Sequence, residues 1–124
     1  MAWPPRVGEL LPRADEAAGV RRKLIAYSLN QTHEMARPKA RGFALILGIG
    51  IDHVDYLESE VLRGILTEPV CAVRANPPYG VNCVVEIPIR GIGTQRKRVA
   101  PVRTIWELTA RTAAPRLISA FPKI

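Results

Sequence analysis

The chain has 124 residues, of which 48% are hydrophobic and 23% are charged. These values are typical of one globular domain, and they exclude both a two-domain protein and a disordered segment. No apolar run approaches the ~18 residues of a membrane span, and the first residues lack the apolar stretch of a secretory signal. We therefore expect a cytoplasmic protein without membrane contact, with an irregular lead-in at residues 1–13 and a single domain at residues 14–124.

The charge of the chain is unevenly distributed. Eighteen basic and eleven acidic residues give a net charge of +7, and five of the acids lie within residues 52–68. The rest of the chain is therefore strongly basic, which favours a nucleic acid as partner. The alternative is a basic surface that only keeps the protein soluble.

The first predicted helix covers residues 21–30. Val20, Leu24 and Tyr27 recur at helical spacing and share one face, which predicts that this face packs on a core. Asn30 is a suitable residue to end the helix.

The second predicted helix starts near Pro38, which fits a first helical turn, and ends at Gly48. Three bases lie at its start: Arg37, Lys39 and Arg41. This is unusual, because a helix N-terminus carries a partial positive charge and favours acids. The third predicted helix, residues 51–66, has the usual arrangement, with acids in its first turns and Asp52 as the expected N-cap.

Four strands are predicted in the second half, at residues 69–75, 81–89, 99–108 and 115–121. Pro88 indicates a sheet edge or a bulge, because it lacks a ladder donor. Residues 90–98 form a predicted exposed hairpin loop. Strict alternation in the last strand would place Arg116, Ile118 and Ala120 opposite Leu117, Ser119 and Phe121. The element order predicts an α+β fold, with N-terminal helices packed on a four-stranded antiparallel sheet.

The sequence contains no P-loop, HExxH or zinc-binding cysteine spacing, so no metal or cofactor is expected. Cys71 and Cys83 are interpreted as buried free thiols, although two adjacent strands could also bring them together. His53 is interpreted as a surface residue.

Six polar residues are candidates for a catalytic site: His33, Lys39, Arg103, Thr104, Arg116 and Ser119. His33 is a candidate general acid or base. Lys39 could hold a phosphate together with free N–H groups at the helix start. Arginine has the forked geometry that suits phosphate contacts, and the two hydroxyls could orient such a group.

Each of these candidates also has an ordinary structural explanation. The histidine could be a plain loop residue, the lysine and arginines could be solvated, and the hydroxyls could bond across strands. Trp106 could stack on a base, or it could be a core aromatic residue. Taken together, the set supplies the acid, base and cations that metal-free RNA cleavage requires, whereas most other hydrolases need residues this chain lacks.

Several segments resemble a bacterial family of small uncharacterised toxin-like domains: KLIAYSLN, the histidine of QTHEM, PKARGFALILGIG, YGVNCVVEIPIRG, VRTIWEL and PRLISAFP. That family in turn resembles the BECR superfamily of barnase, EndoU, colicin-type and RelE-type ribonucleases. The resemblance implies helices on a four-stranded antiparallel sheet and a metal-independent ribonuclease, neutralised by an antitoxin or immunity protein. It points to the same six candidate residues. The chain departs from the family pattern at Glu34, Arg37 and Ser119, where proline, glycine and threonine are usual.

The leading prediction is a toxin-type ribonuclease that cleaves tRNA or mRNA, with a small acidic antitoxin or immunity protein as partner. Six further residues are predicted to bind RNA: Arg37, Arg41, Arg96, Lys97, Arg98 and Trp106. The first alternative is a non-catalytic module that binds RNA or a protein through the basic hairpin Arg96 to Arg98. The second is a structural domain with a merely basic surface.

Overall fold

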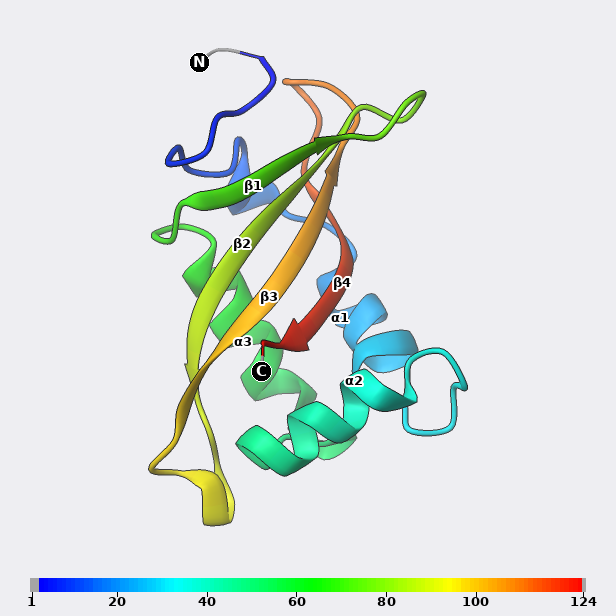
Figure 1. Ribbon diagram of the computed structural model, residues 1–124, viewed down its shortest axis with the longest axis vertical. Coiled ribbons are helices and arrows are strands. Elements are labelled where there is room, and N and C mark those ends of the chain that lie inside the picture. Colours follow the sequence, from blue (N-terminus) through cyan, green and yellow to red (C-terminus); the bar gives the residue numbers. More distant parts are fainter. Residues whose placement is uncertain (1–2, 124) are drawn as a thin grey trace.

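Helices precede strands along the chain and form an α+β fold in the computed structural model, which describes residues 3–123 (Figure 1). The antiparallel sheet has the order β1-β2-β3-β4. Its strands are β1 (Val70–Ala75), β2 (Val81–Arg90), β3 (Val99–Leu108) and β4 (Arg116–Pro122). The predicted fold class is confirmed.

Each of the three α-helices in residues 3–123 is extended at one end by a turn of a different helix type. α1 (Val20–Lys23) continues as π-helical turns over Leu24–Ser28, and α2 (Arg37–Gly42) continues in the same way over Phe43–Leu47. α3 (Val54–Gly64) follows a 3-10 turn at Ile51–His53. Two further 3-10 turns cover Ala14–Glu16 and Gly93–Gln95.

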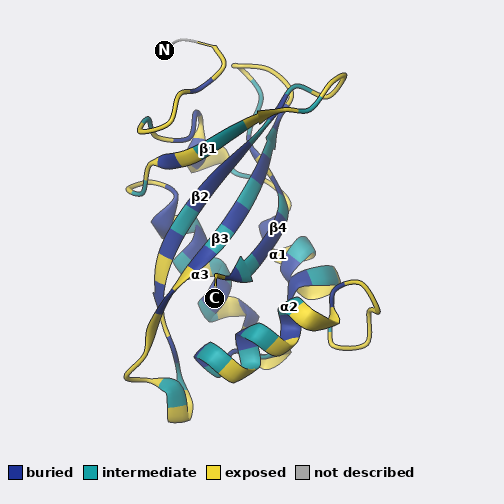
Figure 2. Cartoon of the chain, viewed as in Figure 1, coloured by how far each residue is buried: buried dark blue, intermediate teal, exposed yellow. Residues whose placement is uncertain are grey.

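The core lies between the helices and one face of the sheet (Figures 1 and 2). It contains Leu24, Phe43, Leu57, Ile87 and Trp106. Burying such side chains contributes roughly 1.5–3 kcal/mol each, which makes this layer the main source of stability.

Gly64 allows α3 to lie close to the sheet. A Cβ at this position would lie only 2.4 Å from Cγ2 of Ile87. Because even the smallest side chain would separate the two layers there, glycine fixes how closely α3 packs on β2.

The start of α3 differs from the prediction. His53, not Asp52, is the N-cap residue, and Asp52 lies within the preceding 3-10 turn. The Nδ1 atom of His53 accepts a hydrogen bond from the Gly50 amide at 3.0 Å. This short turn moves the N-cap by one residue, from position 52 to position 53, so the prediction of Asp52 as N-cap is wrong.

The alternation predicted for β4 is also wrong. Ile105 pairs with Ser119 but Trp106 pairs with Leu117, so Ile118 is an extra residue in a β-bulge. A bulge shifts every later side chain to the opposite face of the strand. As a result Arg116, Ser119 and Phe121 share one face instead of alternating.

Pro88 lies at a local edge, as expected. The pairing of β1 with β2 ends at Val85, so β2 has no neighbour on that side at Pro88. Cys71 and Cys83 are both free; Cys83 is buried, and burial raises the pKa of its thiol to about 11. Cys71 is exposed, which corrects the expectation of two buried thiols.

The described part of the lead-in, residues 3–13, has turns but neither helix nor strand. It is packed against β1, because the Gly8 amide donates to Val70 and the Val70 amide donates to Glu9. Just before α1, Ala18 forms a parallel bridge to Arg116, which fixes the start of α1 beside β4.

Candidate functional site

Lys39 is the centre of a small cluster of cations and aromatic rings. It lies in the first turns of α2 and is half-buried. Its Nζ donates a 2.5 Å hydrogen bond to Oγ of Ser119 and lies 5.1 Å and 5.2 Å from the ring centroids of Tyr27 and Phe121. Ser119 and Phe121 share a face because they are two residues apart, and the bulge at Ile118 places that face opposite to the one on which Leu117 is buried.

The Lys39 ammonium lacks a carboxylate partner among the residues that the structure describes. Within residues 3–123 it forms no ion pair. Burial, and next the nearby Lys23 ammonium, lower the pKa of Lys39 from its ordinary value of 10.5. Within the described residues this half-buried cation contacts two ring faces and one hydroxyl and has a second cation nearby, which favours binding of an anion.

The N–H groups at the start of α2 are not available for a phosphate. The amides of Met35 and Ala36 donate to Nδ1 of His33, and the amide of Arg37 donates to its carbonyl oxygen. The Lys39 amide donates to the Ala36 carbonyl. The expectation that these groups join Lys39 in holding a phosphate is therefore wrong, and side chains must supply the contacts.

His33 is brought next to this cluster. It lies in the exposed turn between α1 and α2, and its ring centroid is 4.9 Å from that of Tyr27. Because Nδ1 accepts the two backbone hydrogen bonds, the neutral ring carries its proton on Nε2. In this arrangement His33 can donate a hydrogen bond to a ligand but cannot accept a proton at Nε2.

Tyr27 and Lys23 complete the cluster, and the sequence reasoning did not assign them to it. Lys23 Nζ lies 5.6 Å from the Tyr27 ring centroid, so two ammonium groups and the His33 ring surround one aromatic ring. The available signal was the i, i+4 spacing of Lys23 and Tyr27 on one helix, which places the two side chains together.

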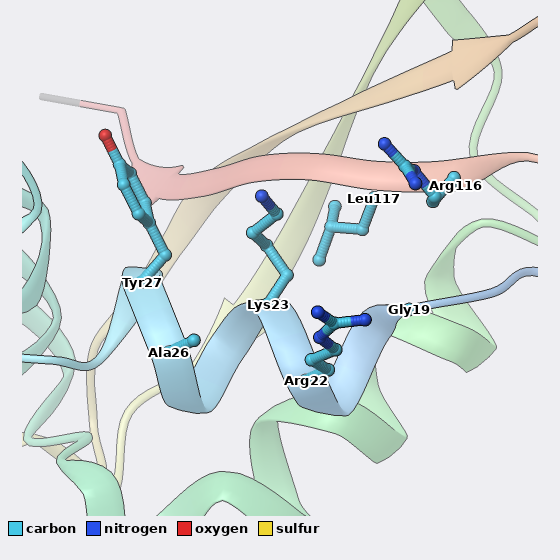
Figure 3. A pocket seen from close by; sticks show the side chains of 7 residues that line it. All are labelled: Gly19, Arg22, Lys23, Ala26, Tyr27, Arg116 and Leu117. Carbon is cyan, nitrogen blue, oxygen red and sulfur yellow. The ribbon is translucent and has the colours of Figure 1, made fainter.

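A basic pocket of about 280 Å³ opens beside Tyr27, between α1 and β4 (Figure 3). Arg22, Lys23 and Arg116 contribute its three cations, and no acidic side chain lines it. In Figure 3 the Tyr27 ring stands at one end of the pocket and Arg116 at the other, with Lys23 between them. The sequence reasoning predicted Arg116 as a site residue but not the two basic residues of α1.

Arg103 lies on the same sheet face as Phe121, its cross-strand partner. However, its Nη1 forms a 2.7 Å salt bridge with Glu86, which Lys123 also approaches at 3.3 Å. Arg103 is thus neutralised by an acid, whereas Arg116 has only a loose contact to Glu107 at 3.8 Å.

Thr104 and Trp106 belong to the core, which corrects two predictions. Both are fully buried. Thr104 Oγ1 donates to the Val85 carbonyl at 2.7 Å and accepts from Trp106 Nε1 at 2.8 Å. A buried hydroxyl bonded in this way cannot orient a phosphate, and a buried indole cannot stack on a base.

The other predicted RNA-binding residues are exposed but lie elsewhere. Arg96, Lys97 and Arg98 are in the hairpin loop between β2 and β3, which projects from the lower end of the sheet in Figure 1. Arg37 and Arg41 line a separate hollow that also contains Glu34. The cluster around Tyr27 therefore brings together only part of the predicted set.

Two properties of the described residues bear on chemistry and location. Residues 3–123 contain no group of three or more His, Cys, Asp or Glu side chains placed to hold a metal ion. Within the same residues, no helix has both the length and the apolar character needed to cross a membrane.

Fold and site together define a small basic α+β domain whose cations gather around an aromatic ring. Over residues 10–124 the chain matches a family model described as a domain of unknown function, DUF6883, and it belongs to that family. No curated protein and no solved structure matches the chain.

Proposed function

We propose that this protein is a metal-independent endoribonuclease whose site is the cluster of Tyr27, His33, Lys39 and Ser119. The observation that carries the proposal is the Lys39 ammonium, which is half-buried between two rings and has no ion pair within residues 3–123. An RNA phosphate would supply the missing negative charge.

Metal-free RNA cleavage proceeds by attack of the 2′-hydroxyl oxygen on the adjacent phosphorus. The new O2′–P bond forms as the P–O5′ bond breaks, which gives a 2′,3′-cyclic phosphate and a 5′-hydroxyl end. The attacking oxygen loses a proton and the leaving oxygen gains one. The site must therefore stabilise charge on the phosphate and exchange two protons.

Lys39 is the group that stabilises the phosphate in this scheme. Ser119 accepts one of its three N–H bonds and holds the ammonium in place, which leaves the other two for phosphate oxygens. Ser119 is thus a positioning residue, and its hydroxyl acts through Lys39.

Tyr27 and His33 divide the remaining tasks. The Nε2–H of His33 is free to donate to the phosphate while Nδ1 remains bonded to the amides of Met35 and Ala36. We therefore assign His33 as a hydrogen-bond donor and not as the general base. The hydroxyl of Tyr27 is assigned to both proton transfers, because its ring is next to both His33 and Lys39. It gives its proton to the leaving O5′ and takes up the proton that the 2′-hydroxyl releases, so the tyrosine returns to its starting form.

The first experiment measures cleavage of an oligoribonucleotide in the presence of a chelator, with the matching deoxyribonucleotide as second substrate. The wild type is expected to cleave only the RNA and to leave 2′,3′-cyclic phosphate ends. Lys39→Gln is expected to lower kcat by about 10²–10³-fold, the usual effect of removing one donor that stabilises transition-state charge.

Arg21→Gln is the matched control. Arg21 is on the same helix as Lys23, but its guanidinium contacts Asp55 and Glu58 on α3. Its removal changes net charge equally and should leave kcat unchanged. Intact RNA with the wild type, or equal rates for the wild type and Lys39→Gln, would overturn the proposal.

We further propose that the activity acts on tRNA or mRNA in the bacterial cytoplasm as a toxin, and that a small acidic antitoxin or immunity protein neutralises it. The support is the resemblance to toxin-like domains together with the unpaired cations of the cluster, which an acidic protein could cover. Expression of the wild type should arrest growth and degrade RNA, and expression of Lys39→Gln should do neither.

A non-catalytic binding module is the second candidate function. The observation in its favour is the exposed basic hairpin, which lies away from Lys39 and could bind RNA or a protein by itself. It predicts salt-sensitive binding that survives Lys39→Gln and yields no cleaved product.

A further inference from the structure

We propose that the pocket between α1 and β4 binds the nucleotide next to the one whose phosphate contacts Lys39. A single RNA strand would then place successive phosphates on either side of Tyr27. This inference rests on the proposed function and extends it to the substrate, which it defines as single-stranded RNA of at least two nucleotides.

Local backbone structure shapes the pocket. The bridge between Ala18 and Arg116 holds the start of α1 against β4. Gly19 has a φ of 73°, which favours glycine, and a Cβ there would lie 3.4 Å from Cγ of Arg116. Glycine is therefore favoured by the backbone conformation at this position, and Arg116 lies beside it and forms one wall of the pocket (Figure 3).

The charges of the pocket are suited to a phosphate. Arg22 and Lys23 form no ion pair within residues 3–123, and the Arg116 side chain is 67% exposed with only its loose contact to Glu107. Three cations without an acid in the lining attract a polyanion, and the two guanidinium groups can bind phosphate oxygens in pairs.

Tyr27 connects the pocket with the Lys39 site. The ammonium groups of Lys23 and Lys39 lie 5.6 Å and 5.1 Å from the same ring centroid, but only Lys23 lines the pocket. Proteins that bind single strands combine a positively charged groove along the backbone with aromatic side chains that stack on bases. In this protein the ring of Tyr27 lies between two cationic positions, those of Lys23 and Lys39.

The size of the pocket limits what it can hold. Its volume of about 280 Å³ is just below the ~300–1,000 Å³ that is usual for sites enclosing a whole small ligand. One nucleotide unit of a longer strand fits this description better than a separate cofactor. Double-stranded RNA would present its phosphates on a rigid helix and not in a pocket beside a ring.

The test measures binding of a short fluorescent 2′-O-methyl oligouridylate, which lacks the attacking 2′-hydroxyl and cannot be cleaved. Lys23→Gln and Arg116→Gln should each weaken binding about tenfold. Each should also reduce the slope of log affinity against log salt by about 0.7, the value for one lost phosphate contact on a single strand. Arg21→Gln should bind like the wild type, and thermal unfolding checks that each variant is folded.

The outcomes separate this inference from the proposed function. If Lys23→Gln and Arg116→Gln bind like Arg21→Gln, the pocket proposal is overturned even when the wild type cleaves RNA. If both weaken binding as expected but the wild type leaves RNA intact, the pocket stands and the cleavage proposal fails. Failure of the folded wild type to bind the probe overturns the pocket proposal.

Discussion

At the scale of single residues, Lys39 keeps a charge in a position that does not favour one. Burial and the Lys23 ammonium lower its pKa, so the folded protein holds this proton less tightly than the unfolded chain does. Residues of this kind are common in functional sites, because an anion that binds there removes the unfavourable interaction.

Replacement of Lys39 by methionine should change how stability depends on pH. At pH values between the lowered pKa and 10.5, Lys39 is more protonated in the unfolded chain than in the folded protein. The unfolding free energy of the wild type therefore increases as pH rises through this range. The Lys39→Met variant does not show this increase, because methionine does not titrate. Its unfolding free energy relative to the wild type should therefore be highest near neutral pH and fall toward pH 10.5. Urea unfolding at several pH values measures this, and a constant difference would contradict it.

The sequence predicted Lys39, His33 and Ser119, which the structure brings together around Tyr27, but the predictions for Thr104 and Trp106 were wrong. Thr104 and Trp106 are two residues apart in β3 and share one face, and that face is the core. Periodicity shows which residues share a face, but it does not show whether a hydroxyl there is already bonded to a neighbour such as Val85. Tyr27 was missed because its spacing also fits a core position.

At the scale of elements, the turn before α2 explains how a helix can begin among bases. The His33 side chain and carbonyl accept the first amide hydrogens, so the helix start is satisfied without an acid. Asn30 stabilises the same turn, since its Oδ1 accepts from the amides of Thr32 and His33. Lys39 can therefore extend sideways to β4.

Substitution of His33 separates this capping role from chemistry. His33→Ala should lower the unfolding free energy by about 1 kcal/mol, because the Met35 amide loses its acceptor and the Ala36 amide keeps only the carbonyl of residue 33. His33→Asn keeps a side-chain acceptor and should recover most of that loss. Neither variant has the Nε2–H donor, so both should cleave RNA more slowly than the wild type. Full activity in His33→Asn would show that His33 acts only through the cap.

The predicted strands were largely correct because prolines and glycines mark the start of most of them. A proline or glycine directly precedes β1, β2 and β4, and the predicted limits of all four strands agree with the structure to within one residue. The bulge at Ile118 had no signal in the sequence, because it depends on how β4 pairs with β3. That single extra residue decides that Ser119 and Phe121 can both reach Lys39.

At the scale of the whole molecule, the basic hairpin and the Lys39 cluster lie at different places on the sheet. The hairpin precedes Val99 at one end of β3, whereas Ser119 and Phe121, the β4 residues of the cluster, pair with Ile105 and Arg103 in the middle of that strand. The base of the hairpin is fixed to the body, because the Ile92 amide donates to the Leu47 carbonyl. Its cations are thus held away from the proposed site.

This separation predicts that the hairpin acts on long RNA only. A variant with Arg96, Lys97 and Arg98 all changed to glutamine should lose more kcat/KM on a folded tRNA than on a dinucleotide. The salt slope for the long RNA should flatten by up to about 2, because as many as three phosphate contacts are lost.

A dinucleotide is long enough to span the Tyr27 pocket but not the length of the sheet. Only a longer RNA can therefore contact both the pocket and the hairpin. Initial rates at several salt concentrations, measured beside Lys39→Gln, distinguish attraction of the RNA from chemistry. Equal losses on both substrates would place the hairpin within the site. Loss of all RNA binding in the hairpin variant, together with normal binding and no cleavage in the wild type, would favour the non-catalytic module.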